Sequence, residues 1–518
     1  MTYRGLVFGF LVFFCRVPVL EAGLQEAIRQ QLLAGKQIYL GASTSDNART
    51  IDASLIVEAV MRHVPVQVRQ AIIRGRLNLQ DVTIEQKFDL AGCVVEDHAD
   101  FSHATFKRDF FVSDAVFKGG ASFRDATFEH GAMLQRTRFD ISVSFENVRF
   151  SEFSAEEAEF GAASFSHARF EAIADFAKST FDSSVAFIAT QFAGQGFFPG
   201  ARFKGSNADF TRAHFVDWTT FGSGEPNFSS VFDGQAIFIE TQFDSSTWFN
   251  GVTFQKEVTF HGARFGSTAE FRGATFHSTA SFERCHFDAD AFFQDSGFQG
   301  LASFRSTIFQ AVYFSSAAKS ATPQFRNDID LLGCTYDQIQ VNWRSFLQYP
   351  NGRSRVHAYN RQPYIQLEEV LRKSGFEDDA NEVYAEQRRV ENTKGWRKYQ
   401  DRFYWLIANY GIDLWHELAI TLILLGFGAW VFSRHGAVCH NECGFRTEPG
   451  ISWWKGFFGA VHQFLPFSLP VKPQWTPSKQ VVVSLGRWPI ITAATYANFL
   501  QIVAKNHSET TSFPDCCR

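Results

Sequence analysis

Residues 238–276 read FIETQFDSSTWFNGVTFQKEVTFHGARFGSTAEFRGATF, and this stretch decides the fold. Phenylalanine returns in it at alternating intervals of five and six residues, at positions 238, 243, 249, 254, 260, 265, 271 and 276. The whole chain has 518 residues and 60 phenylalanines, beside only 3 methionines and 14 prolines. An ordinary globular domain has no need of one side chain so often. The composition therefore indicates a repeat in which one structural position requires phenylalanine each time.

A period of 11 residues is close to three turns of an α-helix, so a helical repeat has to be tested first. Two phenylalanines per 11 residues, separated by Gly, Ser, Thr and Asp, would leave a thin apolar stripe and a poor helix propensity. A small residue stands two places before many phenylalanines, as in Ala121-Ser122-Phe123 and Ala126-Thr127-Phe128. That spacing is typical of a short strand with both residues pointing inward, followed by a polar corner. One unit cannot bury its phenylalanine alone, so the units are expected to stack as coils of a solenoid.

The same rhythm runs through the chain on both sides of this stretch, from Leu79 to Phe309. We expect its phenylalanines to stack into a core ladder along the solenoid. The predicted ladder residues are Phe101, Phe106, Phe117, Phe123, Phe128, Phe139, Phe145, Phe165, Phe170, Phe176, Phe181, Phe187, Phe238, Phe243, Phe249, Phe254, Phe260, Phe265, Phe271, Phe276, Phe282 and Phe287.

The units Ala99-Asp100-Phe101-Ser102-His103-Ala104-Thr105-Phe106 and Ala208-Asp209-Phe210-Thr211 resemble pentapeptide repeats, in the variant with a central phenylalanine and an 11-residue double unit. The resemblance covers residues 76–318. It implies an all-β right-handed quadrilateral β-helix, a pentapeptide-repeat solenoid with four short faces and two double units, about 22 residues, per coil.

The rhythm slips at three places, at Glu152–Glu159, Lys204–Asp209 and Gly222–Val231. Each slip is interpreted as a bulge or a loop between coils. The alternative is a recognition surface, because insertions in solenoids gather on one face. A run of charges is usually a solvated face. The best local candidate for such a surface is the acidic run Glu152, Glu156, Glu157 and Glu159.

The N-terminal flank has the outline of an export signal over residues 1–22. Arg4 precedes an uninterrupted apolar stretch that ends at Cys15, and Ala22 offers a small-residue exit. Arg16, directly after the stretch, leaves a signal anchor as the alternative. Residues 23–75 show helical periodicity and are predicted to cap the first coil, because a bare solenoid end would expose its core and its sheet edges.

The C-terminal flank changes its periodicity after the repeats. Residues 319–360 are predicted to be a linker, and residues 361–405 a helical hairpin broken at Ser374-Gly375. The second helix of the hairpin runs into a basic collar with interleaved aromatic residues. The collar consists of Arg388, Arg389, Arg397, Lys398 and Arg402.

A transmembrane helix is predicted at residues 412–434, because the segment from Leu418 to Phe432 carries no charge and is flanked by Trp415 and Arg434. The basic collar beside it is interpreted as an anchor at the membrane surface rather than as a contact to nucleic acid. The predicted membrane anchor residues are Trp415, Leu418, Leu424, Leu425, Trp430 and Phe432.

The motifs Gln362-Pro363-Tyr364, Arg372-Lys373-Ser374-Gly375 and Tyr410-Gly411 resemble the C-terminal part of membrane-attached pentapeptide-repeat proteins with an ion-channel-like transmembrane region. The resemblance implies two transmembrane helices and a re-entrant segment, for which Trp453–Pro477 within residues 435–518 is the candidate. The chain departs from that pattern twice. It has no Thr-Val-Gly-Tyr-Gly filter, and its second helix would stop at Val503, before an atypical or truncated tail.

The chain lacks the phosphate loop, the nucleophile elbow and the His-Glu-x-x-His motif. We therefore expect no enzyme activity, no cofactor and no small-molecule substrate. Cys439 and Cys443 form half of a zinc-site pattern, but without a second pair a disulfide or two free thiols is favoured. The group His277, Cys285 and His286 is interpreted as filler at variable repeat positions, with Cys285 buried as a small hydrophobe.

These observations favour a non-enzymatic, membrane-tethered pentapeptide-repeat protein, a rigid β-helix scaffold for an unknown protein partner at the cell envelope. An ion-channel-like membrane protein with a β-helix sensory domain is the first alternative. The second, which the family resemblance implies, is a DNA mimic that binds topoisomerases, although interspersed bases interrupt an acidic stripe. A net charge of −5 argues against nucleic-acid binding.

Localisation and assembly follow only in part from the sequence. The export signal predicts a bacterial inner-membrane protein with a periplasmic repeat domain. The positive-inside rule would instead place the basic collar in the cytoplasm. Neither the identity of the partner nor the oligomeric state follows from the sequence.

Overall fold

The structure is a computed structural model. It describes residues 25–41, 46–225, 228–315 and 325–391, residue 399, the helical residues 419, 422–423, 426–427 and 430, and the short strands at 438–440 and 475–477. The chain divides into two compact units, residues 1–391 and 392–518. The predicted signal at residues 1–22 lies outside the described residues.

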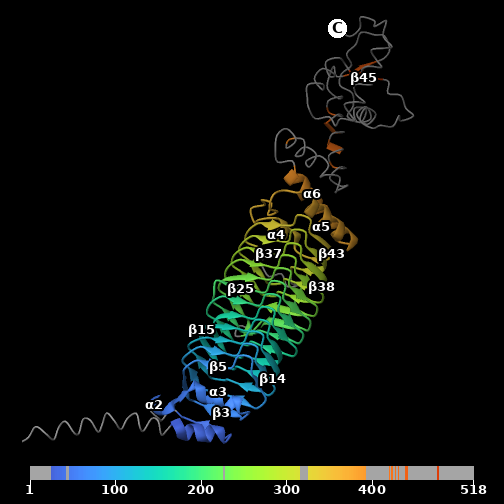
Figure 1. Ribbon diagram of the computed structural model, residues 1–518. Coiled ribbons are helices and arrows are strands. Elements are labelled where there is room, and N and C mark those ends of the chain that lie inside the picture. Colours follow the sequence, from blue (N-terminus) through green and yellow to red (C-terminus); the bar gives the residue numbers. More distant parts are fainter. Residues whose placement is uncertain are drawn as a thin grey trace, which may run out of the picture. The chain divides into compact units, whose positions relative to one another are not determined.

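The first unit contains a solenoid of stacked short strands (Figure 1). Each coil of the solenoid has four strands. In one coil these are β10 (Thr105–Phe106), β11 (Phe110–Phe111), β12 (Val116–Phe117) and β13 (Ala121–Ser122). Each pairs in parallel with the strand 22 residues further on, as Thr105 does with Thr127 and Ala121 with Val143. The coil therefore has four faces, as predicted. Its right-handed winding remains a prediction.

The strands stack in four columns, which we call faces 1 to 4. Face 1 has twelve rungs, so the solenoid has about 12 turns. Besides β10, face 1 contains β6 (Thr83–Ile84), β14 (Thr127–Met133), β16 (Arg149–Ser154), β18 (Arg169–Phe170), β22 (Gln191–Phe192), β26 (His214–Phe215), β30 (Gln242–Phe243), β34 (Arg264–Phe265), β38 (His286–Phe292), β41 (Ile308–Tyr313) and β43 (Thr335–Gln340).

Face 2 follows face 1 along the chain, and the longer strands β14, β16, β38, β41 and β43 run into it. Besides β11, its own strands are β1 (Ile38–Tyr39), β3 (Val66–Arg69), β7 (Phe88–Asp89), β19 (Ala174–Asp175), β23 (Gly196–Phe197), β27 (Thr219–Ser223), β31 (Thr247–Asn250) and β35 (Ala269–Glu270).

Faces 3 and 4 form the other sheet of the solenoid. Besides β12, face 3 contains β2 (Thr50–Asp52), β4 (Ile72–Arg74), β8 (Val94–Val95), β15 (Arg138–Ser144), β17 (Glu159–Ser164), β20 (Thr180–Phe181), β24 (Arg202–Phe203), β28 (Val231–Phe232), β32 (Thr253–Phe254), β36 (Thr275–Phe276) and β39 (Gly297–Phe298). Besides β13 and the ends of β15 and β17, face 4 contains β5 (Leu77–Asn78), β9 (Ala99–Asp100), β21 (Val185–Ala186), β25 (Asn207–Asp209), β29 (Gln235–Ile237), β33 (Val258–Thr259), β37 (Ala280–Ser281), β40 (Ala302–Ser303) and β42 (Ile329–Asp330).

The core consists of phenylalanine rings stacked from coil to coil. The rings of Phe249 and Phe271 lie 5.0 Å apart at an interplanar angle of 1°, whereas Phe249 meets Phe260 edge to face at 5.5 Å and 85°. Both arrangements are favourable for the ring quadrupoles. All of the phenylalanines predicted for the ladder are buried, none with more than 2 % of its surface exposed.

Corners between the faces depend on left-handed backbone. At one of them the Ala115 N–H donates to the Val112 carbonyl at 3.0 Å, and the turn residue Asp114 has φ +60°. Asp125 and Arg136, at the next two such corners along the chain, have φ +58° and +55°. Left-handed backbone costs an ordinary residue energy, and the stacked coils hold it in place.

The N-terminal cap differs from the prediction of a helical segment over 23–75. Residues 25–33, α2 (Asp46–Arg49) and α3 (Ala53–Met61) are helical, and Ile56 of α3 is buried against the first coil. However, β1 to β4 lie in the same segment and pair into the solenoid, as Ile38 does with Val68. Short strands with Val and Ile instead of Phe continue the two sheets, so the coils begin before residue 76.

The C-terminal end of the solenoid also lies beyond the predicted boundary at 318. β42 and β43 pair with β40 and β41, so a further coil occupies part of the segment predicted as a linker. Phe325, Leu331 and Tyr336, which are all buried, keep the intervals of six and five residues. Helix α4 (Trp343–Leu347) then covers the ladder, with Phe346 5.2 Å from Phe314.

A helical hairpin closes this unit, and the rest of the predicted hairpin 361–405, after residue 391, lies outside the described residues apart from Tyr399. It consists of α5 (Gln362–Lys373) and α6 (Glu377–Glu391), and Gly375 between them has φ +81°. Tyr364 and Leu367 of α5 and Val383 of α6 are fully buried. The hairpin therefore shares the continuous core of the solenoid.

In the second unit, the described helical residues are Tyr399, Ala419, Leu422, Ile423, Gly426, Phe427 and Trp430. The strand β44 (Val438–His440) pairs with β45 (Trp475–Pro477). Among the described residues, no helix has both the length and the apolar character needed to cross a membrane. Trp430 is helical and half exposed. The other predicted anchor residues, Trp415, Leu418, Leu424, Leu425 and Phe432, lie outside the described residues, as do Arg397, Lys398 and Arg402 of the collar.

Candidate functional site

The buried cysteines of the solenoid serve its core. Cys93 Sγ donates to the Val68 carbonyl at 3.3 Å, and Cys285 Sγ donates to the Phe260 carbonyl at 2.9 Å. Burial raises the pKa of Cys93 to about 12 and raises the pKa of Cys285 as well, so both thiols stay protonated at neutral pH. In the described part of the chain, no three His, Cys, Asp or Glu side chains are arranged to hold a metal ion.

The outward positions distinguish the faces from one another. On face 4 they are mostly small and polar, as at Ser122, Ser281 and Ser303. On face 2 five of the equivalent positions carry large aromatic side chains. These are Phe111, Phe197, Trp248, Phe292 and Tyr313.

Three of the aromatic side chains outside the core contact one another, and we call them the aromatic cluster. The ring of Trp218 lies 6.2 Å from that of Phe197 and 5.6 Å from that of Trp248, in both cases edge to face. Phe197, Thr220 and Trp248 occupy the same outward position on three successive rungs, and Thr220 is buried between the two rings. The cluster members are only half buried and form an apolar patch on face 2.

Carboxylates surround the aromatic cluster. Asp175 lies one rung before Phe197, Asp217 directly precedes Trp218, and Glu270 lies one rung after Trp248. Burial raises the pKa of Asp175, the nearby charge of Glu156 adds to this effect, and the hydrogen bond from the Ala177 N–H opposes it.

The acidic run of the first slip divides between two faces. Glu152 lies on β16, and Glu156 and Glu157 follow it at the corner that ends face 2, whereas Glu159 begins β17 on face 3. Lys178 lies 3.2 Å from Glu157 and 3.9 Å from Glu156. Glu152, Asp175 and Asp217 have no ion-pair partner among the described residues.

The third slip lies beside the aromatic cluster. β27 carries Thr220, and the chain then leaves the coil at Gly222, which bridges to Ser229 before β28 begins. A Cβ at Gly222 would lie 2.3 Å from the Asn250 carbonyl oxygen, so only glycine fits there. Phe228 of this loop is 46 % exposed. Two of the three slips therefore border face 2.

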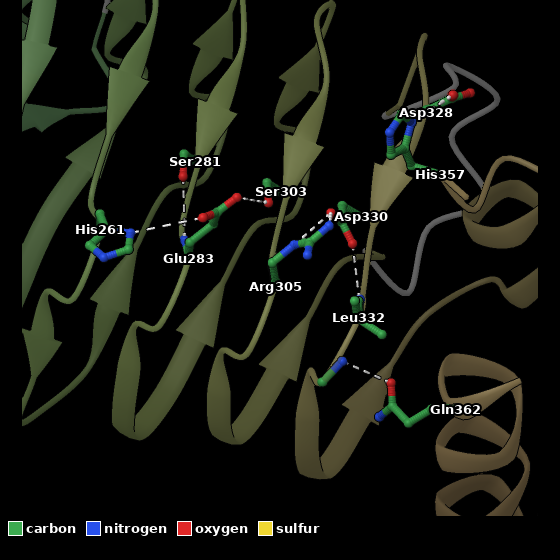
Figure 2. Close-up of polar contacts among 11 residues, drawn as sticks. His261, Ser281, Glu283, Ser303, Arg305, Asp328, Asp330, Leu332, His357 and Gln362 are labelled. Carbon is green, nitrogen blue, oxygen red and sulfur yellow. Dashed lines mark hydrogen bonds and ion pairs between the residues drawn. The ribbon is translucent and has the colours of Figure 1, made fainter. Parts of the chain in front are cut away.

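A second polar arrangement ties the last coils to the hairpin (Figure 2). Glu283 accepts from Ser303 at 2.9 Å, and on the next rungs Arg305 donates twice to Asp330, at 3.0 and 2.7 Å. The Gly333 N–H then donates to Gln362 of α5 at 3.0 Å. These contacts join the edge of the solenoid to helix α5, so their role is structural.

Arg355 lies at the centre of the same junction. Its guanidinium is 1 % exposed and donates to the carbonyls of Phe325, Asn327 and Gln348 at 2.5, 3.0 and 3.1 Å. It also lies 4.3 Å over the ring of Tyr349. Burial lowers the pKa of Arg355 from its ordinary value.

The described members of the basic collar are engaged within the first unit. Arg389 pairs with the buried Glu386 at 2.6 Å and also donates to the Gly352 carbonyl, and Arg388 donates to the Tyr384 hydroxyl at 3.2 Å. These arginines were predicted from the sequence, whereas the aromatic cluster was not. A signal for the cluster was present, since Phe197 and Trp248 each directly precede a ladder phenylalanine and so must point outward.

The family comparison matches two blocks of the solenoid. A family model described as pentapeptide repeats (9 copies) matches residues 90–138 and 228–275. No curated protein matches the chain. Among solved structures, the chain is similar to HetL, a pentapeptide repeat protein involved in heterocyst differentiation regulation from the cyanobacterium Nostoc sp. strain PCC 7120. The two sequences are 14 % identical, and the alignment covers 54 % of this chain and 94 % of HetL with a TM-score of 0.17. The two blocks that match the family model lie within the coils of a β-helical solenoid of about 12 turns.

Proposed function

We propose that the protein is a non-enzymatic scaffold that presents the faces of its solenoid to a partner protein at the bacterial inner membrane. The observation that carries this proposal is the continuous ring ladder, closed by helices at both ends. Because parallel strand pairing and ring stacking hold each coil, the outward residues keep fixed positions about 4.8 Å apart from rung to rung. Such columns are suited to binding an extended partner.

The membrane tether in this proposal is the segment 412–434. It is supported by the uncharged run from Leu418 to Phe432 and by the helical residues Leu422, Ile423 and Phe427, which are 55 %, 68 % and 52 % exposed. Their spacing places them on one side of a helix.

Membrane fractionation with a double variant tests the tether. The wild-type protein should stay with the membranes through a carbonate wash, whereas Ile423→Arg with Phe427→Arg should be released, because each arginine near a helix centre costs about 2.5–3.5 kcal/mol in the bilayer. Ile365→Arg on α5, where Ile365 is 44 % exposed, is the matched control and should stay membrane-bound. Release of the wild-type protein would contradict the tether.

Protease protection then tests the periplasmic location. An epitope placed in the loop after Gly224 should be cleaved in spheroplasts but not in intact cells. Protection until the inner membrane is lysed would place the solenoid in the cytoplasm. Conductance of the purified protein in planar bilayers would favour the ion-channel-like alternative instead.

A further inference from the structure

We propose that the aromatic cluster on face 2 is the docking site for an extended, arginine-rich segment of the partner protein. The inference rests on the scaffold function proposed above and names the chemistry of the partner. Trp218, Trp248 and Phe197 lie outside the ladder, so the core does not require them. Tryptophan is among the side chains that most often dominate protein interfaces.

Cations already cover two other aromatic side chains of this face, Phe111 and Phe292. Lys87 Nζ lies 4.7 Å from the ring centroid of Phe111, and the Arg272 guanidinium lies 4.2 Å from that of Phe292. Among the described residues, no cation lies over Phe197, Trp218 or Trp248. An arginine of the partner would supply the missing cation, because a guanidinium stacks well on an indole ring.

The charge around the cluster favours the same partner. Glu152, Asp175 and Asp217 lack an ion-pair partner among the described residues, whereas Lys178 is paired with Glu157 and Arg272 with Glu270. The surface is therefore complementary to a cationic segment and repels an anionic one such as nucleic acid or an anionic membrane.

The length of the docking site on face 2 determines how long the partner's extended segment must be. From Glu152 on β16 to Glu270 on β35 the face has six rungs, β16, β19, β23, β27, β31 and β35. Five steps of about 4.8 Å give about 24 Å, which an extended chain of about seven residues would span. An occupant that lies along the axis can therefore place alternate side chains on the cluster.

Binding of a labelled peptide to the full-length protein in detergent tests the proposal. The probe is a fluorescein-labelled octapeptide of alternating Arg and Gly, measured by anisotropy at about 50 mM salt. Phe197→Ala, Trp218→Ala and Trp248→Ala should each weaken binding about tenfold or more. Phe376→Ala is the matched control, since Phe376 is 57 % exposed in the hairpin loop, and it should bind like the wild type.

A second pair of variants tests the carboxylates. Glu152→Gln with Asp217→Asn should weaken binding several-fold more than Glu257→Gln with Asp81→Asn, which removes the same charge from corners beside face 4. Equal losses in the two pairs, or no difference between the cluster variants and Phe376→Ala, would overturn the proposal.

A saccharide or a second copy of this chain could occupy the face instead, and each would give a different experimental result. Either result would overturn the proposal. Binding of cellohexaose but not of the peptide, lost in Trp248→Ala, would make the face a saccharide site. A dimer in sedimentation velocity that Trp248→Ala dissociates would make it an interface between copies. The binding assays use purified protein and do not depend on the membrane tether. The docking proposal can therefore fail while the fractionation experiment supports the tether, and the tether can fail while the peptide binds.

Discussion

At the residue scale, one inward position after each left-handed corner shows how the core tolerates polar atoms. It is held by Ala263, Val252, Thr241, Cys285 or Ser296 at different corners, and none of these side chains is large. Thr241 Oγ1 donates to the Phe210 carbonyl at 2.8 Å, and Ser296 Oγ donates to the Phe271 carbonyl at 2.6 Å. A buried hydroxyl is acceptable there because a carbonyl of the preceding coil is always within reach.

Thr241→Val should therefore lower the free energy of unfolding only modestly, by about 0.5–1.5 kcal/mol. Valine keeps the shape of the threonine side chain, and Val252 already occupies the equivalent position at another corner. The loss of stability therefore comes from one hydrogen bond. Urea unfolding measures the difference. Phe249→Ala provides the contrast, because it removes a ring stacked on both sides and should cost about 3–5 kcal/mol. Similar losses in the two variants would contradict the account of the core.

Asp175→Asn should stabilise the protein at neutral pH. Burial raises the pKa of Asp175 in the folded state, so ionisation disfavours folding once the pH exceeds the ordinary aspartate pKa of about 4. Asparagine removes this penalty and can still accept the Ala177 N–H. The gain in melting temperature should be full near pH 7 and vanish at pH values below about 4. A gain that is the same at pH 3 and pH 7 would contradict this explanation.

At the scale of elements, the closing helices depend on one buried cation. Arg355 joins the carbonyls of Phe325 and Asn327, which precede β42, to that of Gln348 at the end of α4. A lysine could not replace it, because a compact ammonium group lacks the planar, forked donors with which the guanidinium reaches all three carbonyls.

Arg355→Met should destabilise the junction by about 2–4 kcal/mol, because it leaves buried carbonyls without a donor. Arg355→Lys should restore only part of the loss. Hydrogen exchange in α4 and α5 is expected to accelerate, while exchange in central strands such as β20 stays slow. Uniform acceleration along the whole solenoid would show that Arg355 has no local role.

At the scale of the molecule, the solenoid is built from equivalent coils that contact their neighbours. Thr253 pairs with Thr275 and Val258 with Ala280, so removing residues 253–274 would join two coils in register. Stability in such arrays is approximately a sum of coil and interface contributions.

The deletion of residues 253–274 should therefore fold, with β-rich circular dichroism, cooperative unfolding and a modestly lower stability. Deletion of residues 253–267, a shorter segment, should not fold, because it moves inward phenylalanines out of phase with the ladder. If the shorter deletion proved the more stable, the coil register would not govern folding.

The repeat, the four-faced coil and the buried ladder could be predicted from the sequence, because each coil places Phe249, Phe271 and their equivalents in the same environment. The helical hairpin was also predictable from its periodicity. The ends of the solenoid were not, since Ile38, Leu331 and Tyr336 stand at ladder positions in place of phenylalanine and weaken the pattern there.

The sequence by itself determined the inward half of this protein, where every ring must match the rings one coil away. Only the tertiary structure decided which outward residues meet. Trp218 and Trp248 are separated by 30 positions and a loop, yet the loop at Gly222 and the register of β27 with β31 bring their rings to 5.6 Å. The physical reason is that outward side chains do not contribute to the ladder, so their neighbours depend on how the coils stack.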